Sequence, residues 1–189
     1  MPRTNEQNKI IKDQRKQDIF NASVILYSIY KNKITTNQFC EKAKCSHGLF
    51  YHYYIDTNQI INDIEKSEIL VNLNNKLIMQ NSQDCLIDIK QSISLLISFI
   101  EKAKKFDIYW ILILLQSNMK NSYINWLINK VKNGQELHII TPGKPEDIVN
   151  IFLYTIIGVL QKKLLQKLDK IQIPPVDNLM QIFIKKTTK

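Results

Sequence analysis

The scarcity of helix-breaking residues is the strongest constraint on the fold of this chain. Only four glycines and five prolines interrupt 189 residues, and no segment shows the strict apolar–polar alternation of a half-buried strand. Apolar residues instead recur every three or four positions, which is the spacing of an amphipathic helix. The sequence therefore predicts an all-α protein.

Helix boundaries follow from capping residues and from the few breaks. The Gly- and Pro-containing run 133–145 predicts a loop, and Pro174-Pro175 separates the last two helices. In the first helix, the predicted buried stripe consists of Ile11, Ile19, Ala22, Leu26 and Ile29. The expected helices span 8–29, 36–43, 47–53, 57–79, 84–104, 106–132, 145–169 and 176–187.

The net charge of +9 indicates an anionic partner, and the distribution of the basic residues indicates which part of the chain would bind that partner. Residues 1–55 carry nine Lys and Arg residues against four Asp and Glu residues, whereas residues 56–189 carry 17 against 13. The basic excess is therefore concentrated in the first third of the chain.

Three cysteines and a start without a secretory pattern predict free thiols in a reducing cytoplasm. The longest apolar run, Ile108–Leu115, is far shorter than the roughly 20 residues that span a bilayer. We expect no membrane-spanning segment.

Two short capped helices are predicted between residues 35 and 54. Thr35-x-x-Gln38 has the form of a capping box, and Ser46 can cap a second helix after a three-residue turn. Asp56-x-x-Gln59 then begins the next helix in the same way. This arrangement predicts a helix-turn-helix, whose second helix enters the major groove of DNA.

The second short helix ends in a row of ring side chains. Phe50 and Tyr54 lie four residues apart and are expected to anchor this helix to the core. Hydroxyl and imidazole groups on the remaining surface could bond phosphates or base edges, although the rings could equally be core and rim packing of a small domain. The surface residues are His47, Leu49, Tyr51, His52 and Tyr53.

The segment Ile19–Ile60 resembles the N-terminal domain of the TetR/AcrR family of transcriptional repressors. Its most specific part is Ser46-x-Gly48-x-Phe50-Tyr51, preceded by Thr35-Thr36. Four departures stand out. The first turn lacks its usual glycine and is one residue shorter, Lys44 replaces the glycine before Cys45, and Thr57 replaces a phosphate-contacting lysine.

The resemblance implies a role for each matching residue. Thr35 and Thr36 would anchor the first short helix to the DNA backbone, and Tyr51 would contact a phosphate. The base edges would be read by His47, Leu49 and His52. The complete set of expected DNA-binding residues is Thr35, Thr36, Ser46, His47, Gly48, Leu49, Tyr51, His52 and Tyr53.

Zinc is a competing interpretation of the same stretch. Cys40, Cys45, His47 and His52 are side chains that zinc favours, but structural zinc sites bring their cysteines together at shorter spacings. Buried free thiols are the favoured interpretation, and no metal or cofactor is expected.

The rest of the chain is rich in aromatic residues, which could form an ordinary helical core. In the resembled family this region encloses an inducer pocket. The candidate pocket residues are Phe99, Tyr109, Trp110, Met119, Tyr123 and Trp126.

The helix from Ile148 to Leu160 is apolar around nearly its whole circumference, so it should be covered on every side. A second subunit would supply part of that cover, and the resembled family dimerises through its last two helices. Ile157 and Phe183 are the expected interface residues.

These features predict a helix-turn-helix domain at 1–56 and a helical ligand-binding and dimerisation domain at 57–189. The expected function is a cytoplasmic, homodimeric, ligand-responsive repressor that binds a palindromic DNA operator. The alternative is a ligand-independent module that organises DNA or binds another protein. No nucleophile–base pair or phosphate-binding glycine loop supports an enzyme.

Overall fold

The computed structural model describes residues 4–78, 84–117, 122–166 and 172–185. The chain divides into two compact units, Met1–Leu70 (the first unit) and Val71–Lys189 (the second unit). The sequence placed a domain boundary after residue 56; the compact first unit extends further because Ile60 of the following helix lies in its core.

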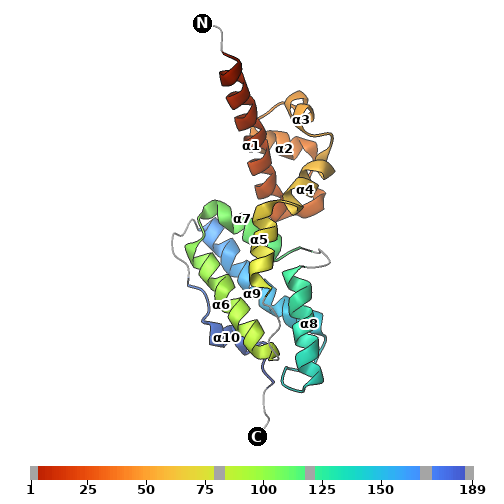
Figure 1. Cartoon of the computed structure of the whole chain (residues 1–189), viewed down its shortest axis with the longest axis vertical. Helices are drawn as coiled ribbons and strands as arrows, with labels where there is room; N and C mark the ends of the chain where they lie inside the picture. The colour runs from red at the N-terminus through yellow and green to blue at the C-terminus, as the bar shows by residue number, and fades with distance from the viewer. Residues whose placement is uncertain (1–3, 79–83, 118–121, 167–171, 186–189) are drawn as a thin grey trace. The chain divides into compact units, whose positions relative to one another are not determined.

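The fold is all-α, as the sequence predicted (Figure 1). Within the described residues, the only β pairing is an isolated antiparallel bridge between Ile140 and Ile184. The helices of the first unit are α1 (Asn5–Tyr30), the 3-10 turn η1 (Lys31–Lys33), α2 (Thr36–Ala43), α3 (His47–Tyr53) and α4 (Thr57–Glu65). Helix α5 (Glu68–Leu77) crosses the division, and the second unit contains α6 (Cys85–Lys102), α7 (Lys105–Leu114), α8 (Tyr123–Glu136), α9 (Pro145–Leu165) and α10 (Val176–Met180).

Side-chain caps explain where several helices begin. The Thr35 hydroxyl accepts a hydrogen bond from the Gln38 backbone N–H, and the Gln38 side chain accepts one from the Thr35 backbone N–H in return. The Ser46 hydroxyl caps α3 and the Asp56 carboxylate caps α4. These three caps are the ones that the sequence predicted, because capping depends on residues only two or three positions apart.

Two predicted long helices are interrupted in the structure. The helix expected over 57–79 breaks after Glu65, where the Ser67 hydroxyl accepts a hydrogen bond from the Leu70 backbone N–H and starts α5. The helix expected over 106–132 is replaced by α7 and α8, with residues 118–121 outside the described residues. The expected 133–145 loop is also shorter, since α8 continues through Gly134 to Glu136.

Aromatic packing forms the core of the first unit. The rings of Phe39 from α2 and Phe50 from α3 stack with their centroids 5.8 Å apart, and Tyr54 packs against Phe50 at 5.7 Å. The predicted stripe on α1 is correct for Ile19, Ala22 and Leu26. It is wrong for Ile11 and Ile29, which are exposed.

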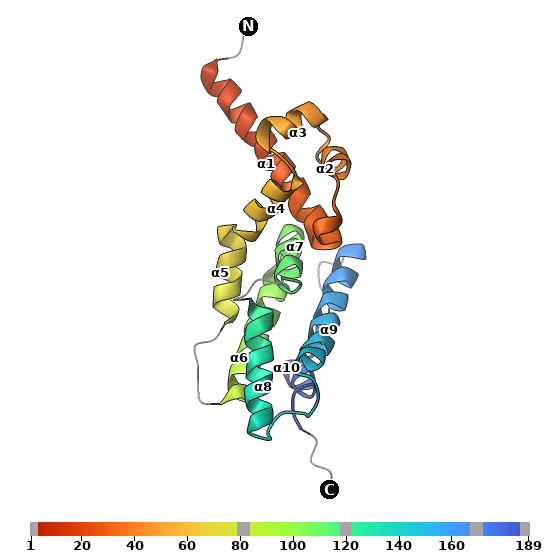
Figure 2. The same ribbon diagram turned by 90° about the vertical axis from the view of Figure 1, so that its right-hand side faces the viewer.

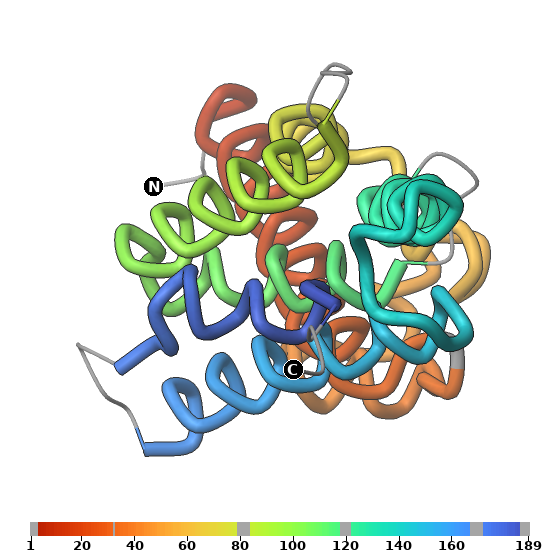
Figure 3. Tube along the Cα trace, turned by 90° about the horizontal axis from the view of Figure 1, so that it is seen from below, coloured from red at the N-terminus to blue at the C-terminus, as the bar shows by residue number. Residues whose placement is uncertain are grey.

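In the second unit, α9 packs against α7 and α8 (Figure 2), and α10 lies against α6 (Figure 3). The buried Lys163 of α9 directs its ammonium towards the carbonyl oxygens of Ile100 and Ala103 at 3.3 and 3.4 Å. This cation satisfies carbonyls that the C-terminus of α6 would otherwise leave unpaired.

Among the described helices, α9 alone is long and apolar enough to cross a membrane by length and composition. Core helices of soluble proteins pass the same test, and α9 has seven residues buried inside its own unit, among them Phe152 and Ile156. Length and composition alone are therefore weak evidence for a membrane span.

We expect Gly134→Ala to lower the free energy of unfolding by about 1–3 kcal/mol, the usual cost of overpacking. A Cβ atom at this position would clash with the Cδ1 atom of Ile140 and would lie only 2.6 Å from its Cγ1 atom. Urea unfolding followed by circular dichroism measures the change. Asn133→Ala, at the exposed neighbouring position of the same helix, is the control that should not destabilise. A Gly134→Ala protein as stable as the parent would contradict the packing of the 139–141 segment.

Candidate nucleic-acid interface

The turn between α2 and α3 is set by two backbone hydrogen bonds. The N–H of Cys45 donates to the carbonyl of Cys40 at 2.9 Å, and the N–H of Lys44 donates to the carbonyl of Glu41 at 3.2 Å. This pair is a Schellman motif, which needs a residue in the left-handed region at its centre. Lys44 occupies that position with φ 52° and ψ 47°, where the resembled family carries glycine.

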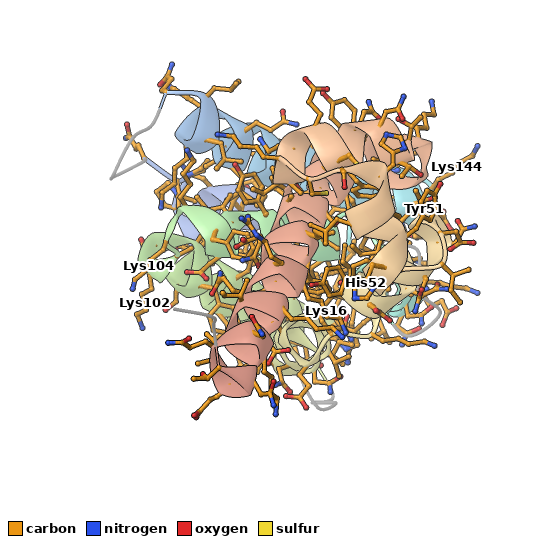
Figure 4. All side chains as sticks on the ribbon, turned by 90° about the horizontal axis from the view of Figure 1, so that it is seen from above. Lys16, Tyr51, His52, Lys102, Lys104 and Lys144 are labelled. Atoms are coloured by element: carbon orange, nitrogen blue, oxygen red, sulfur yellow. The ribbon has the colours of Figure 1, made fainter. Side chains whose placement is uncertain are left out.

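Helix α3 is held by one face and exposed on the other. Phe50 is fully buried, and Leu49 and Tyr53 are partly buried against the same core. The opposite side presents His47, Gly48, Tyr51 and His52 to solvent (Figure 4, Tyr51 and His52 labelled). Because α3 has only two turns, burying Phe50 is enough to orient this polar face outward.

The predicted DNA-binding residues fall into three groups by their exposure. Leu49 and Tyr53 contribute to packing, which leaves less of each side chain for an external partner. Thr36 is partly exposed, with its hydroxyl 3.5 Å from the Tyr51 hydroxyl, so that α2 and α3 form one surface. The exposed members are Thr35, Ser46, His47, Gly48, Tyr51 and His52.

One contact that the sequence did not reveal joins α3 to the N-terminal half of α1. The Tyr53 hydroxyl donates a hydrogen bond to the backbone carbonyl of Lys12 at 3.1 Å. Arg15, one turn further along α1, acts electrostatically on the turn before α3. Burial and the neighbouring Cys40 thiol raise the pKa of Cys45 to about 11, and the Arg15 charge opposes that rise.

The four zinc-favouring side chains do not converge. Cys40 is buried and Cys45 partly buried in the core, whereas His47 and His52 are exposed on the other side of α3. Among the described residues, no group of three His, Cys, Asp or Glu side chains is arranged to hold a metal ion.

Among the predicted pocket residues, Tyr123 and Trp126 are brought together by α8. Their rings stack with centroids 6.0 Å apart, and the Lys130 ammonium lies 5.8 Å from the centre of the Trp126 ring. The same ammonium forms a buried ion pair with Asp88 of α6 at 2.6 Å. Burial raises the pKa of Tyr123, and the nearby Ser92 hydroxyl opposes that rise.

The other predicted pocket residues are more scattered. Tyr109 contacts Phe106 edge to face, Trp110 is buried in α7, Phe99 is partly buried in α6, and Met119 lies outside the described residues. Asp88 and Lys130 were missed because nothing in the sequence indicates that two charges 42 residues apart will pair.

The two predicted dimer-interface residues differ in their accessibility. Ile157 is partly exposed on α9. Phe183 is fully buried and packs against Phe152 of its own chain, with ring centroids 5.7 Å apart. Phe183 therefore contributes to the core of the second unit, and its side chain offers no surface to a partner.

Lys44→Gly is expected to raise the free energy of unfolding by up to about 1 kcal/mol, because glycine adopts the left-handed conformation without a Cβ penalty. Urea unfolding of the purified protein measures the effect. The matched control is Lys42→Gly, which removes an equal charge from the helical part of α2 and should destabilise by roughly 1 kcal/mol. If Lys44→Gly and Lys42→Gly lowered the free energy of unfolding equally, the left-handed conformation of Lys44 would not strain the turn.

Comparisons with known proteins address the fold. The sequence matches no known protein-family profile and no curated protein. Among solved structures, a putative fatty acid metabolism regulator of Clostridium perfringens is similar, with a TM-score of 0.52 and 14% identity over 87% of this chain and 92% of that chain. A TetR-family transcriptional regulator of Haemophilus influenzae has a TM-score of 0.51 and 13% identity over 93% and 99%.

SmeT, the repressor of a multidrug efflux pump of Stenotrophomonas maltophilia, has a TM-score of 0.50 and 13% identity over 90% of both chains. At such low identity, the likeness concerns the fold. The N-terminal helix-turn-helix and the helical second unit agree with it along nearly the whole chain. The resemblance indicated by the sequence motif is thus confirmed in three dimensions, and this chain has the fold of the TetR-family transcriptional regulators.

Proposed function

We propose that the protein is a DNA-binding transcriptional regulator that uses α3 as its recognition helix. The observation that carries this proposal is the polar face of α3, where His47, Tyr51 and His52 are exposed while Phe50 fixes the helix from behind. A short helix with exposed hydrogen-bonding side chains suits the major groove of double-stranded DNA.

The side chains divide naturally between backbone and base contacts. Tyr51 and Thr36 lie together at the α2–α3 junction, where two hydroxyls can donate to one phosphate group. His47 and His52 project from α3 and are proposed to meet base edges. Gly48, an exposed residue without a side chain, lets the helix backbone approach the DNA closely.

A homodimer is proposed on the basis of the uncovered face of α9. Ile151 and Tyr154 are 57% and 69% exposed, and Leu165 is 83% exposed. Gly158 lies on the same side with no heavy atom within 4 Å of an added Cβ, so that a second helix could approach closely there. Two copies related by a two-fold axis would present two α3 helices to a palindromic operator.

A small-molecule inducer is proposed to bind in the second unit near α8. The indole N–H of Trp126 is buried without a hydrogen-bond partner in the described part of the chain, which is costly unless a ligand supplies an acceptor. A ligand that favours one arrangement of α6 and α8 would shift the protein between binding-competent and binding-incompetent states. Repression is the proposed outcome of DNA binding.

The proposed location is the cytoplasm, where the free thiols would remain reduced. The competing function is a DNA-organising or protein-binding module that needs no ligand. It would be favoured if DNA affinity stayed constant across a library of aromatic and acceptor-bearing small molecules.

His52→Ala is expected to relax base preference at one operator position by about 1–3 kcal/mol, because a base contact carries sequence information. Tyr51→Phe should instead weaken binding to all sequences by roughly tenfold, as expected for a lost phosphate contact. Selection from random DNA followed by fluorescence anisotropy measures both effects. Tyr30→Phe, an exposed tyrosine of the same unit, is the control. Unchanged affinity and preference in His52→Ala would refute the proposed orientation of α3.

Tyr154→Glu and Ile157→Glu are expected to yield folded monomers, because an unpaired charge at an interface costs several kcal/mol. Operator affinity should then fall by roughly 10²-fold or more as linked binding is lost. Light scattering and titration on the full operator are the measurements, with Ile87→Glu at the exposed apolar position of α6 as the control. Phe183→Glu should unfold the second unit instead of separating subunits. Dimers that survive both α9 changes would place the interface elsewhere.

A further inference from the structure

The N-terminal half of α1 lies outside the core of the first unit. Every residue from Thr4 to Gln17 (the arm) is exposed, and the first buried residue of the helix is Ile19. The arm nevertheless begins with a complete capping box, in which Thr4 and Gln7 bond each other's backbone N–H groups. The arm continues directly into the buried half of α1, so that the helix is already nucleated there and the arm extends it.

The charges of the arm are sorted around the helix. At about 100° per residue, Lys12, Arg15 and Lys16 lie within about 60° of Ile19 around the helix axis. Lys9 lies about 80° away, and Glu6 and Asp13 lie more than about 100° away. Arg15 also forms an exposed ion pair with Asp18 at 3.8 Å. Because Ile19 packs into the core beside α2 and α3, the basic face of the arm points to the same side as the recognition helix.

One contact supports this orientation: the Tyr53 hydroxyl of α3 donates a hydrogen bond to the Lys12 backbone carbonyl at 3.1 Å. The charge of Arg15 also lowers the pKa of Cys45 in the turn that precedes α3, against the larger effect of burial. Figure 4, which draws the whole chain from above, labels Lys16 on α1 and His52 on α3. The hydrogen bond from Tyr53 to the Lys12 backbone carbonyl therefore fixes the arm relative to α3. Because the acceptor is a backbone atom, replacing charged side chains of the arm does not remove this bond.

We propose that the arm is a second DNA-contact element, which places Lys12, Arg15 and Lys16 on the phosphate backbone beside the groove that receives α3. This inference rests on the proposed function and extends it from the helix-turn-helix to α1. Tyr53 is then a positioning residue: its hydroxyl sets the distance between the backbone-binding arm and the base-reading helix.

A membrane surface is the other anionic partner that a basic helix can bind. Such helices need a broad apolar face opposite the charges. The arm contains only two apolar residues, Ile10 and Ile11, and its basic face continues the surface of the recognition helix. Charge and placement both favour DNA.

The test compares two variants of equal charge. Arm variant Lys12→Gln/Arg15→Gln/Lys16→Gln should show a shallower dependence of log affinity on log salt, by about 0.9 per lost phosphate contact. Base preference should not change. The control Lys76→Gln/Lys132→Gln/Lys144→Gln removes three exposed charges from the second unit and should retain the parental slope.

The outcomes separate this inference from the proposed function. If the parent protein binds no DNA, the proposed function fails. If the parent binds specifically but the arm variant keeps the full salt slope, the arm inference fails and the proposed function stands. The arm inference would also be overturned by a second pattern. In that pattern the parent binds phosphatidylserine vesicles, the arm variant does not, and both bind DNA with the same affinity.

Tyr53→Phe tests the positioning role without changing any charge. The substitution should lower DNA affinity several-fold in the parent protein. It should have little effect in the arm variant, because the phosphate contacts that the Tyr53 hydroxyl positions are already absent there. Equal losses in both backgrounds would show that Tyr53 acts only through the stability of α3. Circular dichroism at the assay temperature confirms that each variant is folded.

Discussion

Burial of Phe50 is the interaction on which the proposed DNA-binding surface depends. Helix α3 has only seven residues, too few to be stable alone, and Phe50 fixes it between Phe39 and Tyr54. Once that ring is buried, helical geometry determines which side chains remain outside. Three features follow from the burial of Phe50. They are the polar face of α3, the proximity of Thr36 to Tyr51, and the hydrogen bond from Tyr53 to α1.

Features encoded within a few residues could be predicted from the sequence. The caps at Thr35, Ser46 and Asp56 and the limits of α2 and α3 are of this kind, because each depends on atoms one helical turn apart. The break before Ser67 was missed, since a serine hydroxyl stabilises a helix start only where packing also turns the chain.

Features that depend on distant partners could not be predicted. Apolar spacing alone could not show that Ile11 lies beyond the core, or that Phe183 packs on Phe152 of its own chain. The bond from Tyr53 to Lys12 and the Asp88–Lys130 pair each join residues more than 40 positions apart. For the same reason, the sequence predicted α3 and the basic excess of the N-terminal third of the chain, but not the hydrogen bond from Tyr53 that joins them.

The bridge between Ile140 and Ile184 has a consequence for the order in which the chain can fold during synthesis. It is reinforced by the Thr141 N–H donating to the Phe183 carbonyl and by the Thr141 hydroxyl donating to the Ile184 carbonyl. The second unit can complete its core only after residue 184 has left the ribosome. The contacts within the first unit are all made by residues up to Leu70, and domains generally fold in order of synthesis. A nascent chain should therefore carry a folded α2–α3 pair while its second unit is still incomplete.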